Sequence, residues 1–158
     1  MQQRPGKLHG RDDAYELALR ALNRKERSEA ELDAWLAHRG VGQAERAEVL
    51  ALLAEAGAVD DERFARRFAE DKRELAGWGP DRIAESLAKR GISQELIDAA
   101  LAAETDDELA GRAAELLVRS GAEVTGERGR QRALGLLVRR GFPLEIAYDA
   151  VRGLQRNG

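Results

Sequence analysis

Lys89-Arg90-Gly91-Ile92 closes one amphipathic segment of this 158-residue chain, and similar stretches close two others, at His38-Arg39-Gly40-Val41 and Arg139-Arg140-Gly141-Phe142. The three glycines lie 51 and 50 residues apart. A glycine just after a helix adopts a left-handed backbone without strain, and the apolar residue that follows can fold back on the helix end. The spacing therefore predicts three copies of one helical unit, which would present a long surface to a partner.

The segment before each glycine has a helical apolar stripe. Eight and four positions before the glycines stand the pairs Leu32/Leu36, Ile83/Leu87 and Ala133/Leu137. Residues four apart share one face of a helix, so each pair is expected to be buried. Another apolar helix follows each glycine. The helix that opens each unit begins at an acidic pair, whose carboxylates cap free amides. These acidic pairs begin at Asp12, Asp60 and Asp106, and Phe64 with Phe68 forms a further i, i+4 pair in the middle unit.

We therefore expect an all-α fold of about nine helices, in three tandem three-helix units that form an extended, curved array. The expected helices cover residues 12–24, 28–39, 43–56, 60–76, 80–90, 93–103, 105–120, 127–140 and 143–155. The expected units are residues 12–57, 58–104 and 105–158, after a disordered basic tail at 1–11. No stretch alternates with the period of two that a strand requires.

Composition excludes several classes of function. The chain has no cysteine, so disulfides, thiolate metal sites and thiol nucleophiles are ruled out. No apolar run approaches the ~20 residues that span a bilayer, and the first residues lack the apolar stretch of a signal peptide. We expect a cytoplasmic protein that does not bind membranes.

The sequence also gives no sign of an active site. Two histidines, His9 and His38, have no recognised metal-ligand spacing. The acids at 106–108 lack the spacing of a calcium loop, so helix capping explains them better. A phosphate-binding Walker sequence is missing too. We expect a non-enzymatic protein without metal or cofactor, and a monomer because no coiled-coil seam is visible.

Charge is uneven along the chain, although the net charge is only −3. Residues 93–110 contain six acids and no Lys or Arg, whereas residues 111–158 contain nine arginines and five acids. Basic side chains are the candidates for contact with phosphates or carboxylates. The candidate binding residues are Arg63, Arg66, Arg67, Arg73, Lys89, Arg90, Arg128, Arg130, Arg132, Arg139 and Arg140.

Each group of candidates also has a structural interpretation. Cations before the glycines stabilise a helix C-terminus by about 0.3–1 kcal/mol each. Arg63, Arg66 and Arg73 share a helical face that either binds a partner or is solvated and paired with nearby glutamates. The set from Arg128 to Arg140 is the strongest basic surface, because Glu127 is its one acidic neighbour.

Aromatic residues add little to the search for a site. Trp35 lies between Leu32 and Leu36 at helical spacing, which is typical of a core position. Trp78 stands between two glycines in a turn and is the one tryptophan that we expect to be exposed. An exposed ring there could contact a partner or seat the helix that follows.

Three motifs follow one another along the chain. The first is Val59-Asp60-Asp61-Glu62-Arg63-Phe64-Ala65-Arg66-Arg67-Phe68. Next come Gly79-Pro80-Asp81-Arg82-Ile83 and Leu87-Ala88-Lys89-Arg90-Gly91-Ile92, and the third is Leu137-Val138-Arg139-Arg140-Gly141-Phe142. In this order they resemble the RecX family, which regulates the RecA recombinase. The first motif, the strongest, is similar to the family's acidic pair followed by Arg-Phe-Ala, and the third to its carboxy-terminal Arg-Gly-Phe segment. The resemblance covers roughly residues 12–155, although Ser86 stands where the family often has Glu and the first unit matches loosely.

The resemblance implies a modular helical protein that lies in the groove of the RecA filament on single-stranded DNA, with weak direct DNA contact. There it would restrain filament growth, strand exchange and ATP hydrolysis, as part of recombinational repair and the SOS response. The rival hypothesis is an autonomous duplex-DNA-binding protein built of helix-turn-helix-like units, which would need basic recognition helices. A helical adaptor for an unrelated protein is the third alternative.

Overall fold

The computed structural model describes residues 10–157, which fold into nine helices and no strands. The helices are α1 (Arg11–Arg24), α2 (Glu29–His38), α3 (Gln43–Glu55), α4 (Asp61–Leu75), α5 (Pro80–Lys89), α6 (Gln94–Leu101), α7 (Asp106–Ser120), α8 (Glu127–Arg139) and α9 (Leu144–Asn157). The predicted all-α fold and the order of its helices are confirmed, with ends within two residues of those expected. The expected tail at 1–11 lies outside the described residues except at its end, where Arg11 is helical.

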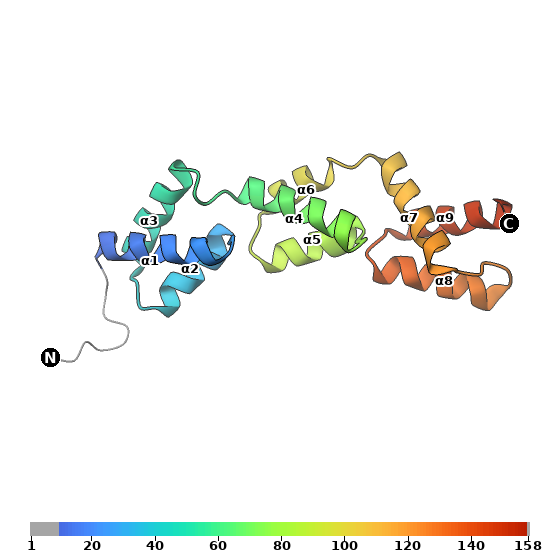
Figure 1. Ribbon diagram of the computed structural model, residues 1–158, viewed down its shortest axis with the longest axis horizontal. Coiled ribbons are helices and arrows are strands. Elements are labelled where there is room, and N and C mark those ends of the chain that lie inside the picture. Colours follow the sequence, from blue (N-terminus) through green and yellow to red (C-terminus); the bar gives the residue numbers. More distant parts are fainter. Residues whose placement is uncertain (1–9, 158) are drawn as a thin grey trace.

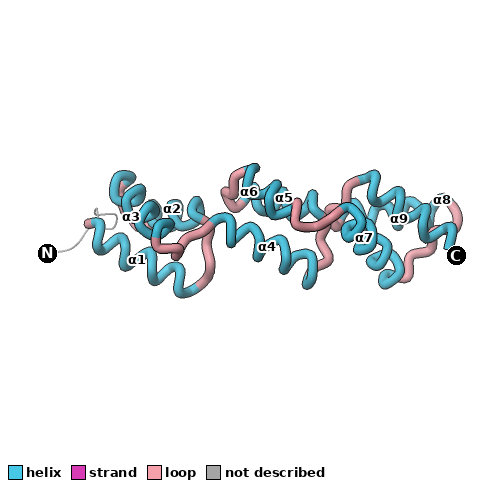
Figure 2. The backbone as a smooth tube through the Cα atoms, turned by 90° about the horizontal axis from the view of Figure 1, so that it is seen from above, coloured by secondary structure: helices cyan, strands magenta, loops and turns pink. Residues whose placement is uncertain are grey.

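The nine helices form three groups of three along one axis (Figure 1). Each helix packs mainly against the two others of its own unit. The second helices α2, α5 and α8 follow one another along the lower side of the molecule in Figure 1. In the perpendicular view of Figure 2, the first helices α1, α4 and α7 lie along one edge and the others along the opposite edge. The array therefore exposes a long surface of second helices.

Each unit has its own hydrophobic core. Leu36, Leu87 and Leu137, the last apolar residues of the three stripes, are completely buried in separate clusters. Val59, which we placed in the second unit, packs in the first core instead. Because the cores are separate, other interactions must fix one unit against the next.

The expected capping by acidic pairs is found at only one of the three first helices. Thr105 rather than Asp106 is the N-cap of α7, and α1 begins after Gly10 without a side-chain cap. Asp60 precedes α4, and its carboxylate accepts a hydrogen bond from the Arg63 backbone N–H at 3.0 Å. Gly40, Gly91 and Gly141 have φ angles of 84°, 82° and 95°. These angles lie in the left-handed region that favours glycine, so the repeated motif ends all three second helices in the same way.

Candidate partner-binding surfaces

Arg90, at the end of α5, joins the second unit to the first. Its guanidinium donates two hydrogen bonds to the Glu31 carboxylate, at 3.0 and 3.1 Å, and lies 4.5 Å from the centre of the Phe64 ring. The Ser28 hydroxyl donates to the Arg90 carbonyl at 2.6 Å. Paired hydrogen bonds between Arg and a carboxylate fix geometry as well as adding stability. The first turn of α2 is thereby held against the C-terminus of α5.

This contact lowers the pKa of the Glu31 carboxyl. Partial burial raises the pKa of its carboxyl, but hydrogen bonds from Arg90 and from the Ser28 backbone N–H outweigh that effect, and the net pKa is lowered. Glu31 also accepts in the capping box at the start of α2, where Ser28 is the N-cap. One carboxylate therefore both caps its own helix and binds the next unit.

The second joint uses backbone groups more than side chains. The Gly79 N–H donates to the Arg140 carbonyl at 2.7 Å, and the Asp81 N–H donates to the Gly141 carbonyl at 2.9 Å. Arg140 returns a hydrogen bond from its guanidinium to the Ala76 carbonyl at 3.0 Å. A Cβ atom at Gly79 would lie 2.5 Å from the Gly141 carbonyl, so only glycine allows this approach.

The two joints share one design. In each, the N-terminus of a second helix meets the Arg-Gly end of the next second helix, so α2, α5 and α8 run head to tail. The partial positive charge of one helix end thus faces the partial negative charge of the other. The Arg-Gly motif is both a helix C-terminus and the connection between units.

A buried ion cluster reinforces the second joint. The Glu104 side chain is 8% exposed and accepts a hydrogen bond from Arg112 at 3.0 Å. Arg73 lies 3.6 Å from the same carboxylate and donates to the Ala100 carbonyl at 2.8 Å. Because Arg73 is on α4 and Arg112 on α7, this single carboxylate connects the second unit to the third.

The arginines of α4 face different surroundings. Arg63 donates to the Gly57 carbonyl at 3.0 Å and lies 3.6 Å from Glu26, at the junction with the first unit. Arg73 points to the third unit, whereas Arg66 and Arg67 are exposed. The face that we expected Arg63, Arg66 and Arg73 to share is therefore mostly occupied by contacts within the chain.

The arginines of the third unit separate into two groups. Arg130 pairs with Glu127, and Arg140 is part of the second joint. Arg128, Arg132 and Arg139 are exposed, and none of them lies within 4.0 Å of a carboxylate among residues 10–157. At 3.6 residues per turn these three positions fall within about 40° of one another, over about 16 Å of helix. We call them the α8 stripe.

The other predicted positions have mixed surroundings. Lys89 is 75% exposed and pairs with Glu85 at 3.2 Å, which is a weak surface contact. Trp78 is half-buried rather than fully exposed: its ring meets Phe68 edge-on, and the Arg82 guanidinium lies 4.2 Å from its centre. Trp78 thus packs against the first turn of α5.

Sequence reasoning missed a second basic surface, in the first unit. A hollow of about 410 Å³ lies between α1 and α2 and is lined by Leu17, Arg20, Ala21, Asn23, Arg24, Trp35 and Arg39. We call it the unit-one groove. Trp35 is partly buried and forms one wall, so it is not purely a core residue. The signal available in the sequence was Arg20 with Arg24, four residues apart on one helix.

The fold and these surfaces define an all-helical tandem array with exposed basic surfaces on its first and third units. Residues 10–157 contain no cluster of three or more potential metal ligands. None of the nine helices in that range is long and apolar enough to cross a membrane.

Comparison with known proteins places the chain in a family. The profile "RecX, first three-helix domain" matches residues 14–53, and "RecX, second three-helix domain" matches residues 60–101. The Regulatory protein RecX of Mycolicibacterium vanbaalenii is 37% identical over 150 residues, which cover 89% of this chain and 81% of that protein. Its counterpart in Halorhodospira halophila is 40% identical over 126 residues, or 79% and 78% of the two chains. This chain belongs to the RecX family.

A solved structure shows the same fold. The crystal structure of RecX from Lactobacillus salivarius superposes with a TM-score of 0.83, covering 92% of this chain and 96% of that one, at 19% identity. The resemblance inferred from the three motifs is therefore confirmed at the level of family and fold.

Proposed function

We propose that this protein binds the RecA filament on single-stranded DNA and inhibits its ATP hydrolysis, growth and strand exchange. It would do so as a non-enzymatic cytoplasmic monomer. Membership of a family of regulatory proteins supports the general role. The RecA filament as partner follows from the family resemblance of the motifs.

The α8 stripe is the single observation that carries the proposal in the structure. Three exposed arginines on one face without carboxylate partners repel one another, and an anionic partner would relieve that repulsion. Their spacing along about 16 Å of helix suits successive phosphates of a nucleic-acid strand. The Arg90 and Arg140 guanidiniums, by contrast, are engaged in the joints, so we no longer propose them as direct contacts.

The test is a titration of ATP hydrolysis by the cognate RecA on single-stranded DNA. The variant Arg128→Gln/Arg132→Gln/Arg139→Gln removes the α8 stripe. Its control, Arg119→Gln/Arg130→Gln/Arg152→Gln, removes the same charge from the same unit at arginines that pair with carboxylates. We expect the concentration of the first variant that gives half inhibition to be at least about tenfold higher than that of the wild type, as for the loss of a few charged contacts.

Two results would contradict the proposal. One is unchanged ATP hydrolysis at excess wild-type protein. The other is equal loss in both variants, which would mean that net charge alone governs inhibition.

Tight duplex binding without RecA would favour the rival helix-turn-helix function. However, α6 carries Glu95 and Asp98 and no cation, and Arg46 of α3 pairs with Asp33 at 2.9 Å. The third helices α3 and α6 therefore have little free positive charge and are poor recognition helices, and in α9 Arg152 pairs with Asp149.

A further inference from the structure

The unit-one groove has a basic rim, although Arg20 also lines a neighbouring hollow with Asp12, Asp13 and Glu16. Arg20 and Arg24 lie one turn apart on α1, and Arg39 lies across the groove at the end of α2. All three are exposed, and none has a carboxylate within 4.0 Å among the described residues. No Asp or Glu lines the groove. Glu26, the nearest acid after Arg24 in the sequence, is turned toward Arg63 of the second unit.

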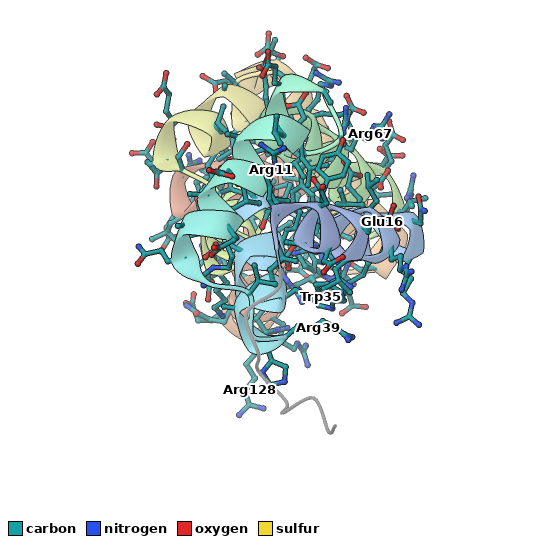
Figure 3. The ribbon with its side chains drawn as sticks, turned by 90° about the vertical axis from the view of Figure 1, so that its left-hand side faces the viewer. Arg11, Glu16, Trp35, Arg39, Arg67 and Arg128 are labelled. Atoms are coloured by element: carbon teal, nitrogen blue, oxygen red, sulfur yellow. The ribbon has the colours of Figure 1, made fainter. Side chains whose placement is uncertain are left out.

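The floor of the groove is apolar. Leu17 and Ala21 provide its α1 side, and Trp35 provides its α2 side. In Figure 3, which looks at this end of the molecule, Trp35 and Arg39 lie together beneath α1. The volume of about 410 Å³ falls within the range of about 300–1,000 Å³ that is usual for ligand sites. A ligand there would gain apolar burial on the floor and charge contacts on the rim.

Trp35 itself is covered by cations. The Arg39 guanidinium lies 4.1 Å from the ring centre, and the Arg27 guanidinium lies 5.6 Å away. A nucleic-acid base would have to displace such a guanidinium to stack on the ring, and phosphates alone would leave the aliphatic floor unused. Stacking orients Arg39 but leaves its N–H groups available in the guanidinium plane, where they can grip a carboxylate.

We propose that the unit-one groove binds an acidic protein segment that carries a large apolar side chain between carboxylates. The apolar side chain lies on Leu17 and Ala21, beside the part of Trp35 that lines the groove, and the carboxylates reach Arg20, Arg24 and Arg39. This follows the general pattern of a peptide anchored in an apolar groove and oriented by arginines at its rim. The proposal does not rest on the action on RecA, because it concerns a different unit and a different ligand from the α8 stripe.

The test uses fluorescence anisotropy with two labelled synthetic octapeptides. One has Leu-Phe at its centre between aspartates and glutamates, and its twin has Ala-Ala there. We expect the Leu-Phe peptide to bind at least about tenfold more tightly than its twin, since burying two large apolar side chains contributes more than about 1.4 kcal/mol. In an NMR titration the indole N–H signal of Trp35 should move and that of Trp78, the second tryptophan, should not.

Variants then locate the site. Arg20→Glu/Arg24→Glu should weaken binding of the Leu-Phe peptide by about tenfold or more. The matched variant Arg119→Glu/Arg152→Glu, with the same charge change at exposed arginines outside both basic surfaces, should weaken it less than about threefold. Circular dichroism confirms that both variants remain helical.

Three outcomes would overturn the proposal. Equal binding of the two peptides would show general charge attraction without use of the apolar floor. No binding by the wild type at millimolar peptide would show that the groove is not a peptide site. Binding of a single-stranded oligothymidylate that is lost in Arg20→Glu/Arg24→Glu, with no peptide binding, would assign the groove to nucleic acid instead.

Discussion

Replacing Gly79 with alanine isolates the contribution of the second joint to stability. Gly79 has φ −83° and ψ 170°, which any residue adopts, so alanine adds no backbone strain there. Its Cβ would nevertheless lie 2.5 Å from the carbonyl carbon and oxygen of Gly141 and 2.6 Å from the Phe142 nitrogen. These are backbone atoms that cannot rotate away, so the second and third units must move apart.

The expected cost has two parts. Overpacking of a tight contact costs about 1–3 kcal/mol. Separation also weakens the hydrogen bonds from the Gly79 and Asp81 N–H groups, at 2.7 and 2.9 Å, each of which contributes about 0.5–1.5 kcal/mol. Together these effects should lower the free energy of unfolding by about 2–4 kcal/mol. For a chain of this length, 2 kcal/mol lowers the midpoint of thermal unfolding by about 4–8 °C.

The control is Gly10→Ala. Gly10 is also an N-cap with extended backbone, φ −64° and ψ 165°, but a Cβ there would meet nothing within 4 Å. Like Gly79→Ala, this variant replaces an N-cap glycine and lowers the conformational entropy of the unfolded chain. Differential scanning calorimetry should show a larger shift for Gly79→Ala, or a transition split in two as the third unit unfolds separately. Equal shifts for the two variants would refute this role of the joint.

Three further substitutions test the remaining contacts between units. The pKa of Glu31 is lowered in the folded protein, so its contribution is complete above its ordinary pKa of 4.5 and is lost as the pH falls through the folded value. The difference in unfolding free energy between wild type and Glu31→Gln should therefore shrink on acidification, and a constant difference would count against the pair with Arg90. Ser28→Ala should cost about 1–2 kcal/mol in chemical denaturation, more than the exposed cap variant Ser93→Ala, because Ser28 also binds the Arg90 carbonyl. Glu104→Ala should lower the free energy of unfolding by about 3 kcal/mol, because it leaves Arg73 and Arg112 without their shared carboxylate. The exposed control Glu115→Ala should lower it by less than about 1 kcal/mol. Similar values for the two variants would rule out a structural role for the cluster.

Local sequence patterns were sufficient for the helices but not for how units meet. The stripes ending at Leu36, Leu87 and Leu137 are i, i+4 patterns, and the positive φ of the following glycines reflects local sterics. Both kinds of signal span less than two helical turns. They predict each unit independently of the others, which is why the helix ends were found within two residues.

The joints depend on residues far apart in the sequence. Arg90 and Glu31 are 59 positions apart, and Arg140 and Ala76 are 64 apart. An arginine before a helix-ending glycine has a sufficient local explanation in the helix dipole, so its pairing across units leaves no separate trace in one sequence. The same limit applies to the unit-one groove, where Trp35 has core spacing and Arg39 reads as a helix end. Only the packing of α1 on α2 puts them beside Arg20 and Arg24.

The joints also determine whether distant surfaces can act together. The unit-one groove and the α8 stripe lie on the first and third units, so joints that hold the units in line fix their separation. When two sites bind one assembly at a fixed separation, the second contact forms at a high effective concentration, and overall affinity exceeds either contact alone. On the proposed functions, Gly79→Ala should therefore leave peptide binding by the groove and oligothymidylate binding by the stripe within about twofold of wild type. Where the acidic segment bound by the groove belongs to the same filament that the stripe contacts, Gly79→Ala should raise the concentration needed to inhibit RecA by about tenfold or more, because only the geometry between sites is lost. If inhibition by Gly79→Ala is unchanged while calorimetry shows the joint broken, the units act independently and rigidity of the array has no part in the function.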